Sequence, residues 1–200
     1  VLGRIGLAWS IAAVLYLNFG VKTRAAIAVA VLAGYGALSA LVAAPDAAGA
    51  GPLTFEGNLA GYIDRQFLPG KLIYGSFDPE GLLSTVPAVV TAMLGMFTGE
   101  FVRRGDIRGG RKTLWMAAAA AALLAAGLAF SGVLPVNKKL WSSTFVCVVG
   151  AYSLGMFALF YYLIDVRGWR RWTLFFRVVG LNSITIYLAQ RIVAVSYTHL

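Results

Sequence analysis

Long apolar stretches separated by short polar links are the dominant pattern of this chain. Six such stretches, each roughly 18 to 22 residues long, cover residues 2–19, 25–44, 82–102, 113–133, 143–164 and 174–195. Because an α-helix rises about 1.5 Å per residue, each stretch can cross about 30 Å of hydrocarbon. The pattern predicts an all-α, polytopic transmembrane helix bundle with about six spans. It also predicts one long structured extracytoplasmic loop at residues 45–81.

The composition agrees with a membrane protein. Hydrophobic residues make up 60% of the chain and charged residues only 12%, whereas soluble domains carry about a quarter charged residues. The net charge of +9 is explained by basic loops beside a membrane, and in the absence of a nucleic-acid motif we expect no nucleic-acid partner. A single cysteine, Cys147, excludes an internal disulfide and a cysteine-based zinc site. We expect no metal.

Lysine and arginine concentrate in the first, third and fifth links between the apolar stretches. The basic residues of these links are Lys22, Arg24, Arg103, Arg104, Arg108, Arg111, Lys112, Arg167, Arg170 and Arg171. The positive-inside rule places these links in the cytoplasm, with Val1 and the C-terminus on the extracytoplasmic side. Lys138 and Lys139, in the fourth link, are the one pair that opposes this orientation.

The long second link carries adjacent opposite charges at Asp64 and Arg65. Neighbouring side chains on a helix point in different directions, so we expect these two charges to have separate partners. One interpretation is a surface helix end with solvated charges. The other is a binding site built over the ends of the membrane helices.

The sequence Asp78-Pro79-Glu80-Gly81 leads into the third apolar stretch. Asp78 fits a helix N-cap, Pro79 fits the first helical position and Glu80 fits the first turn, so capping alone can explain the motif. Alternatively, Glu80 lies at the membrane boundary, where a carboxylate can hold a hydroxyl or amino group of a substrate.

Two further polar motifs leave a choice between structure and binding. In the fourth link, Lys138 can extend to lipid headgroups, or Asn137 and Lys138 can face the same pocket as the acidic loop. In the sixth stretch, Asn182 can hydrogen-bond to a neighbouring helix, or it can line a pocket.

Taken in order, short motifs along the chain resemble the bacterial relatives of heparan-α-glucosaminide N-acetyltransferase, a family of multi-spanning membrane acyltransferases. The matching motifs are at 3–7, 61–65, 78–84, 135–141, 164–166 and 175–187. Their order and their position at helix ends make the resemblance specific. It predicts that residues 1–195 form one transmembrane acyltransferase-like domain, the C-terminal part of the family's bundle, and that residues 196–200 are a tail outside the family.

The resemblance implies transfer of an acetyl group from acetyl-CoA to an amino sugar or glycan on the extracytoplasmic side of the bacterial inner membrane. It places the family's catalytic histidine in an earlier extracytoplasmic loop that is absent from this chain. The catalytic residue is therefore unknown here, and we expect an N-terminal part to be missing and the fragment by itself to be inactive. His199 is not expected to be catalytic.

The residues expected to bind substrate are polar and lie at or near helix ends: Asp64, Arg65, Asp78, Glu80, Asn137, Lys138 and Asn182. Asp64 and Glu80 are expected to orient the sugar. Asn137 and Lys138 are expected to bind sugar or acyl oxygens. Asn182 is expected to line an acyl tunnel.

Acetyl-CoA is anionic and needs a basic region to receive its phosphates. The candidates for this role are Arg103, Arg104, Arg111 and Lys112. The alternative is that these residues only set the topology of the chain.

A transporter or permease is the competing functional class, and a noncatalytic membrane subunit is a third. No internal repeat or pair of broken helices favours a transporter, and no chain of buried carboxylates is present for proton coupling. The pattern leaves open the identity of the acceptor and the oligomeric state, including a homo-oligomer.

Overall fold

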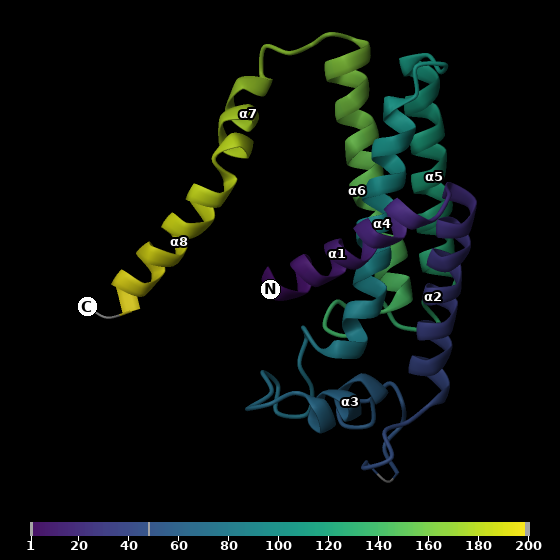
Figure 1. Cartoon of the computed structure of the whole chain (residues 1–200), viewed down its shortest axis with the longest axis vertical. Coiled ribbons are helices and arrows are strands. Elements are labelled where there is room, and N and C mark those ends of the chain that lie inside the picture. Colours follow the sequence, from purple (N-terminus) through teal and green to yellow (C-terminus); the bar gives the residue numbers. More distant parts are fainter. Residues whose placement is uncertain (1, 48, 199–200) are drawn as a thin grey trace. The chain divides into compact units, whose positions relative to one another are not determined.

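The computed structural model describes residues 2–47 and 49–198, which are mostly α-helical and contain no named strand. The expected all-α fold is confirmed. The helices are α1 (Leu2–Asn18), α2 (Val21–Leu41), α3 (Leu59–Phe67), α4 (Leu82–Arg103), α5 (Gly109–Ala129), α6 (Ser143–Tyr161), the π-helical turn η1 (Tyr162–Val166), α7 (Thr173–Leu181) and α8 (Ser183–Thr198) (Figure 1). His199 and Leu200 lie outside the described residues, so the expectations about the tail stay predictions.

Four helices among the described residues are long and apolar enough to cross a membrane: α2, α4, α5, and α6 together with η1. The first apolar stretch forms α1, which has 17 residues. The sixth stretch is not one continuous helix, because the backbone breaks at Asn182 between α7 and α8. Asparagine and serine compete with helical hydrogen bonds through their own side chains, which explains a break at Asn182-Ser183.

The chain forms two compact units, Val1–Ala158 and Leu159–Leu200. In the first unit α4 is the central helix, and it contacts α1, α2, α3 and α5. The buried core around α4 consists largely of small side chains, which let helices approach closely where no hydrophobic effect drives them together. Its members are Ala8, Ala12, Ala28, Ala88, Val89, Val90, Met93 and Val146.

One buried ion pair joins α2 to α4 near the ends that carry the basic links. Arg24 is 4% exposed, and its Nη2 lies 2.8 Å and 3.0 Å from the two carboxylate oxygens of Glu100. The guanidinium also lies 4.6 Å from the ring centroid of Tyr16 and 5.5 Å from that of Phe97. Arg24 therefore has a packing role in addition to the topological one that the sequence suggested.

Breaking this pair should destabilise the first unit. We expect Arg24→Gln to lower the free energy of unfolding in detergent by about 3 kcal/mol, because it leaves Glu100 without its cation in a partly buried position. Arg104→Gln is the matched control, because Arg104 and its partner Asp106 are 56% and 60% exposed and such an exposed pair contributes little to stability. Equal losses in the two variants would contradict a special role for Arg24.

Candidate functional site

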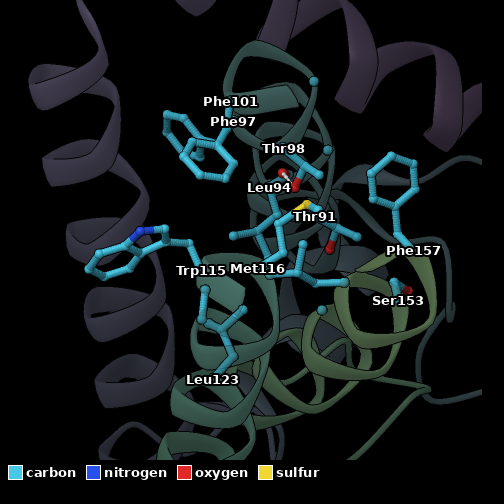
Figure 2. A pocket seen from close by; sticks show the side chains of 15 residues that line it. Thr91, Leu94, Phe97, Thr98, Phe101, Trp115, Met116, Leu123, Ser153 and Phe157 are labelled. Atoms are coloured by element: carbon cyan, nitrogen blue, oxygen red, sulfur yellow. Dashed lines mark hydrogen bonds between the residues drawn. The ribbon is translucent and has the colours of Figure 1, made fainter. Parts of the chain in front are cut away.

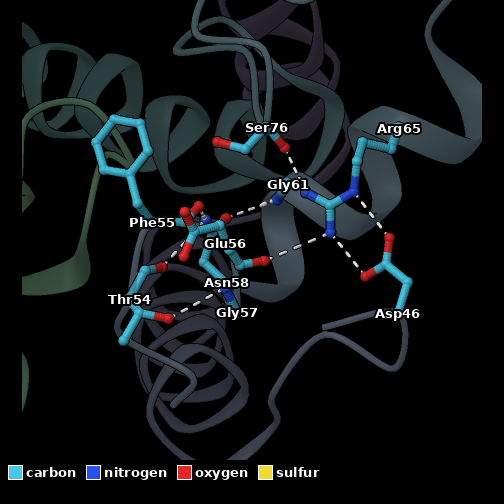
Figure 3. A network of polar contacts seen from close by, with 9 residues as sticks. All are labelled: Asp46, Thr54, Phe55, Glu56, Gly57, Asn58, Gly61, Arg65 and Ser76. Carbon is cyan, nitrogen blue, oxygen red and sulfur yellow. Dashed lines mark hydrogen bonds and ion pairs between the residues drawn. The ribbon is translucent and has the colours of Figure 1, made fainter. Parts of the chain in front are cut away.

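The segment between α2 and α4 folds around the short helix α3, at the end of the first unit where α2 finishes and α4 begins (Figure 1). We call this the α3 end of the unit. Asn58 caps α3, because its Oδ1 accepts the backbone N–H of Gly61 at 2.6 Å. Its Nδ2 also donates to the carbonyl of Phe55 at 2.7 Å (Figure 3). The helix is thereby fixed to the loop before it.

Arg65 ties α3 to three other parts of this segment (Figure 3). Its Nε and Nη2 form a bidentate ion pair with the carboxylate of Asp46, at 2.8 Å and 2.7 Å. Its Nη1 donates to the carbonyl of Ser76, and Nη2 lies 3.5 Å from the carbonyl of Glu56. A planar guanidinium suits such simultaneous contacts. Arg65 therefore holds the loops of the α3 end in place.

Asp64 is fully buried, at 0% exposure. Its Oδ1 accepts the N–H of Leu82 at 3.0 Å, and its Oδ2 accepts the N–H of Asp78 at 3.2 Å. Burial raises the pKa of this carboxyl, although the two backbone N–H groups act in the opposite direction. Separate partners for Asp64 and Arg65 are confirmed, and the interpretation of solvated charges is wrong for Asp64.

Helix α4 begins later in the sequence than the motif Asp78-Pro79-Glu80-Gly81 predicted. Gly81, and not Asp78, is the N-cap of α4. Asp78 instead accepts the N–H of Glu80 through Oδ1 at 2.8 Å, which closes a turn before the helix. The first N–H of α4, that of Leu82, donates to the carboxylate of Asp64 in α3. This long-range contact takes the place of a cap from a neighbouring side chain.

Two glycines allow the close approach of α3 to this turn. A Cβ on Gly81 would lie 2.1 Å from Oδ2 of Asp64, and a Cβ on Gly61 would lie 2.8 Å from the carbonyl oxygen of Ser76. Real side chains do not approach so closely, so both positions need glycine for packing.

Arg4, in the first turn of α1, reaches the same end of the unit. Its guanidinium donates to the carbonyls of Pro79 and Ser84, which flank Glu80 in the sequence. The guanidinium also lies 4.3 Å from the ring centroid of Trp141, within range of a cation–π contact. The sequence reasoning named neither Arg4 nor Trp141 as a site residue, although both lie inside matching motifs.

Trp141 has a left-handed backbone conformation, with φ of 52°, which is uncommon for a large residue and occurs often at functional sites. Its indole Nε1 donates to Oγ1 of Thr91 in α4 at 3.2 Å. The turn that leads to Trp141 is closed by Asn137, whose Oδ1 accepts the N–H of Lys139 at 2.8 Å. The amide oxygen of Asn137 is therefore used to build the turn.

The two lysines of this turn differ in their surroundings. The Nζ of Lys139 lies 4.4 Å from the ring centroid of Tyr74 and 5.3 Å from that of Phe55, so it packs on aromatic rings of the α3 end. Lys138 is exposed, and its binding role stays a prediction.

The remaining candidates lie away from the α3 end. Asn182 belongs to the second unit, where its Nδ2 donates to the carbonyl of Val178 at 2.8 Å, and its role in an acyl tunnel stays a prediction. In the basic link, Lys112 is buried and its Nζ donates to the carbonyl of Val102 at 2.7 Å.

Arg104 in the same link pairs with Asp106, with 2.6 Å between Nη2 and Oδ2. Arg103 and Arg111 are exposed.

A pocket of about 790 Å³ lies between α4, α5 and α6. Figure 2 shows the aromatic and aliphatic side chains around it, which include Phe97, Phe101, Trp115 and Phe157. Thr91 also lines the pocket and accepts the hydrogen bond from Trp141. One end of the pocket is thus in contact with the residues that organise the α3 end.

Comparison with known proteins gives the family. Heparan-alpha-glucosaminide N-acetyltransferase of Homo sapiens is 31% identical to the chain over 157 residues, which is 68% of this chain and 23% of the human protein. The chain belongs to the heparan-alpha-glucosaminide N-acetyltransferase family. The Mus musculus enzyme of the same name is 30% identical over 154 residues, with the same shares of the two chains. No protein-family model matches the chain.

Membership of this family confirms the resemblance read from the motifs. Together with the four long apolar helices it identifies an integral membrane protein of an acetyltransferase family. The chain spans about 23% of the length of the curated relatives that it matches.

The close contact at Gly81 can be tested by adding one methyl group. We expect Gly81→Ala to lower the free energy of unfolding by about 2 kcal/mol, because the new Cβ overlaps the Asp64 carboxylate. Gly99→Ala, in the interior of α4 with no atom within 4 Å of its Cβ, is the control and should raise stability by up to about 1 kcal/mol through helix propensity. Thermal unfolding in detergent measures both, and a neutral Gly81→Ala would contradict the contact.

The contributions of Asp64 and Asp46 to the stability of the α3 end should depend on pH in opposite directions. Burial raises the folded-state pKa of Asp64 above 3.8, so its stabilising contribution is present below pH 3.8 and is lost as the pH rises through the folded-state pKa. The hydrogen bond from Arg65 lowers the pKa of Asp46 below 3.8, so its contribution is present above pH 3.8 and is lost as the pH falls through the folded-state pKa.

Unfolding measurements on Asp64→Asn and Asp46→Asn between about pH 3 and about pH 7 would check these signs. The stability of the unchanged protein relative to Asp64→Asn should fall as the pH rises, and relative to Asp46→Asn it should increase. If the stability difference changed with pH in the same direction for both variants, the environments described for Asp64 and Asp46 would be wrong.

Proposed function

We propose that the natural protein containing this chain transfers an acetyl group from acetyl-CoA to the amino group of a sugar or glycan, at the membrane face where the α3 end lies. The observation that carries the proposal is the 31% identity with a glucosaminide N-acetyltransferase over 157 residues. The geometry supports it, because four separate motifs of the chain supply residues to the α3 end of one unit.

The reaction sets the requirements for the site. The acceptor ammonium must lose a proton to a base before its nitrogen attacks the thioester carbonyl. The new C–N bond then forms, the C–S bond breaks, and the CoA thiolate leaves and takes up a proton. We assign the base to the histidine that the family resemblance places in a loop outside this chain. The residues of this chain orient the acceptor and stabilise the developing oxyanion.

Glu80 is the carboxylate that we assign to the acceptor. It follows Pro79, and the segment around it is held by Arg4 through the carbonyls of Pro79 and Ser84. Asp64 has both oxygens engaged by backbone N–H groups, so we assign it a positioning role: it fixes the turn that carries Glu80.

Asn137 and Lys138 are assigned to the sugar or acyl oxygens. The Oδ1 of Asn137 closes the turn toward Trp141, so it is the amide NH₂ group that we assign as a donor to substrate. Lys138 is exposed next to this turn, where a long cationic side chain can reach an oxygen at the α3 end.

We assign the pocket between α4, α5 and α6 to the acetyl-bearing arm of the donor. Its volume of about 790 Å³ and its apolar lining suit a narrow, uncharged chain. The pocket extends from Thr91, next to Trp141, to Phe101 and Trp115 near the basic link. Arg103 and Arg111 are then the candidates for the CoA phosphates, since Lys112 and Arg104 already have partners.

We also propose an orientation of the chain in the membrane. If the basic links lie in the cytoplasm, as the positive-inside rule indicates, the α3 end is extracytoplasmic and the donor enters from the opposite side. We therefore propose a location in the bacterial inner membrane with acceptor and donor approaching from different faces.

The proposal is tested with the natural protein containing this chain, reconstituted in liposomes and supplied with radiolabelled acetyl-CoA and glucosamine-type acceptors. Glu80→Gln and Asn137→Ala should each lower kcat/KM for the acceptor by roughly tenfold or more, the effect of losing one charged or well-placed hydrogen bond. Acceptor-dependent release of free CoA is the second readout.

Glu56→Gln is the matched control, because Glu56 is an exposed carboxylate of the same segment that has no role assigned to its side chain. It should leave transfer unchanged. If Glu80→Gln and Asn137→Ala both leave transfer unchanged, the site assignment is wrong. Flux of the acceptor across the membrane without release of CoA would instead identify a transporter.

A further inference from the structure

The second unit contains a basic and aromatic turn that has no role in the acetyl transfer proposed above. It comprises residues 162–172, which we call the 162–172 turn, and it consists of η1 and the link from η1 to α7. Three arginines and two tryptophans lie within these eleven residues: Arg167, Trp169, Arg170, Arg171 and Trp172. One carboxylate, Asp165, opposes the three positive charges, so the turn has a net charge of +2.

The backbone of the turn is defined by unusual hydrogen bonds. In η1 the ladder widens to a π-helical pattern, and the N–H of Arg167 donates to the carbonyl of Tyr162 at 2.9 Å. The N–H of Trp169 donates to the carbonyl of Leu163 at 2.9 Å. Gly168 has a φ of +71°, which favours glycine and lets the chain turn away from the helix. Single π-helical turns of this kind occur frequently at functional sites.

Two of the arginines form hydrogen bonds within the turn through their Nε atoms. The Nε of Arg167 donates to the hydroxyl of Tyr162 at 3.0 Å, and the Nε of Arg170 donates to the carbonyl of Ile164 at 3.3 Å. The side chain of Arg170 is 67% exposed, and its Nη2 lies 3.9 Å from Asp165, which is longer than a hydrogen bond. These Nε contacts restrict the two side chains, so less conformational entropy is lost when the Nη atoms of Arg167 and Arg170 bind a ligand.

Trp172 lies in an aromatic cluster at the end of the same turn. Its ring lies within 5.6 Å to 6.3 Å of the rings of Phe176, Phe160 and Trp169, measured between centroids. Its Nε1 is buried and has no hydrogen-bond partner in the part of the chain that the structure describes. Trp172 therefore packs the turn onto Phe160 before it and Phe176 in α7.

The surface that follows the turn is apolar. Leu174, Phe175 and Phe176 at the start of α7 are 68%, 69% and 59% exposed. A ligand that suits the whole surface therefore has a phosphate at one end and a hydrocarbon chain at the other. Soluble phosphates would use only the arginines.

We propose that the 162–172 turn binds an anionic phospholipid. The phosphate lies between the guanidinium groups of Arg167 and Arg170, and one acyl chain follows α7. Arginine forks match phosphate oxygens in geometry, and basic residues next to a membrane helix are attracted to anionic lipid. This site is independent of the acetyl-transfer proposal.

The test uses the natural protein containing this chain, purified in detergent, with phosphatidylglycerol or phosphatidylcholine added in mixed micelles. Phosphatidylglycerol should raise Tm by about 3 °C or more relative to phosphatidylcholine, as expected for a ligand that binds only the folded state. Native mass spectrometry should detect retained phosphatidylglycerol. R167Q/R170Q should remove both effects.

K22Q/R108Q is the matched control, because it removes two exposed basic residues from other links and the same net charge. It should keep the response to phosphatidylglycerol. An equal loss in K22Q/R108Q, or a full response in R167Q/R170Q, would overturn the proposal. Equal protection by coenzyme A alone, also removed by R167Q/R170Q, would assign the arginines to a soluble phosphate and likewise overturn it.

A second variant covers the case in which R167Q/R170Q does not fold. R167K/R170K keeps both charges but loses the planar forks and the Nε contacts, so the Tm response to phosphatidylglycerol should fall by at least half. An unchanged response in this variant would mean that charge alone attracts the lipid, and the geometry proposed here would be wrong.

Discussion

The buried carboxylate of Asp64 is the contact on which the α3 end depends. It is withdrawn from water and accepts the N–H groups of Asp78 and Leu82, so it closes the start of α4 against α3. A buried carboxylate without such donors would be strongly unfavourable. This requirement explains why Gly81 has no side chain and why α4 begins where it does.

Around this contact, the site is built from segments that are distant in the sequence. Arg4 from α1 holds the carbonyls on either side of Glu80 and packs on Trp141. Trp141 in turn bonds to Thr91, which lines the pocket between α4, α5 and α6. The side chains that surround the proposed acceptor site are therefore in contact with the proposed path of the donor.

Several polar residues of this family member hold the structure together. Arg65, Asp64 and Lys112 were all candidates for binding, and each has its polar atoms engaged by other parts of the chain. Lys138 is exposed beside the framework that such residues build. Several charged groups near helix ends of this chain are thus used in packing, because an unpaired buried charge is costly.

The sequence by itself determined the all-α membrane fold, the bounds of the long helices to within a few residues and the family, because hydrophobic length and motif order are local properties of a chain. It also predicted that Asp64 and Arg65 have different partners. Only the tertiary structure decided which partners these are, because they lie 9 to 19 residues away for this pair and 75 and 80 residues away for Arg4. Neither helical periodicity nor capping rules carry information over such separations, so the roles of Arg4, Trp141 and Gly81 follow only from packing.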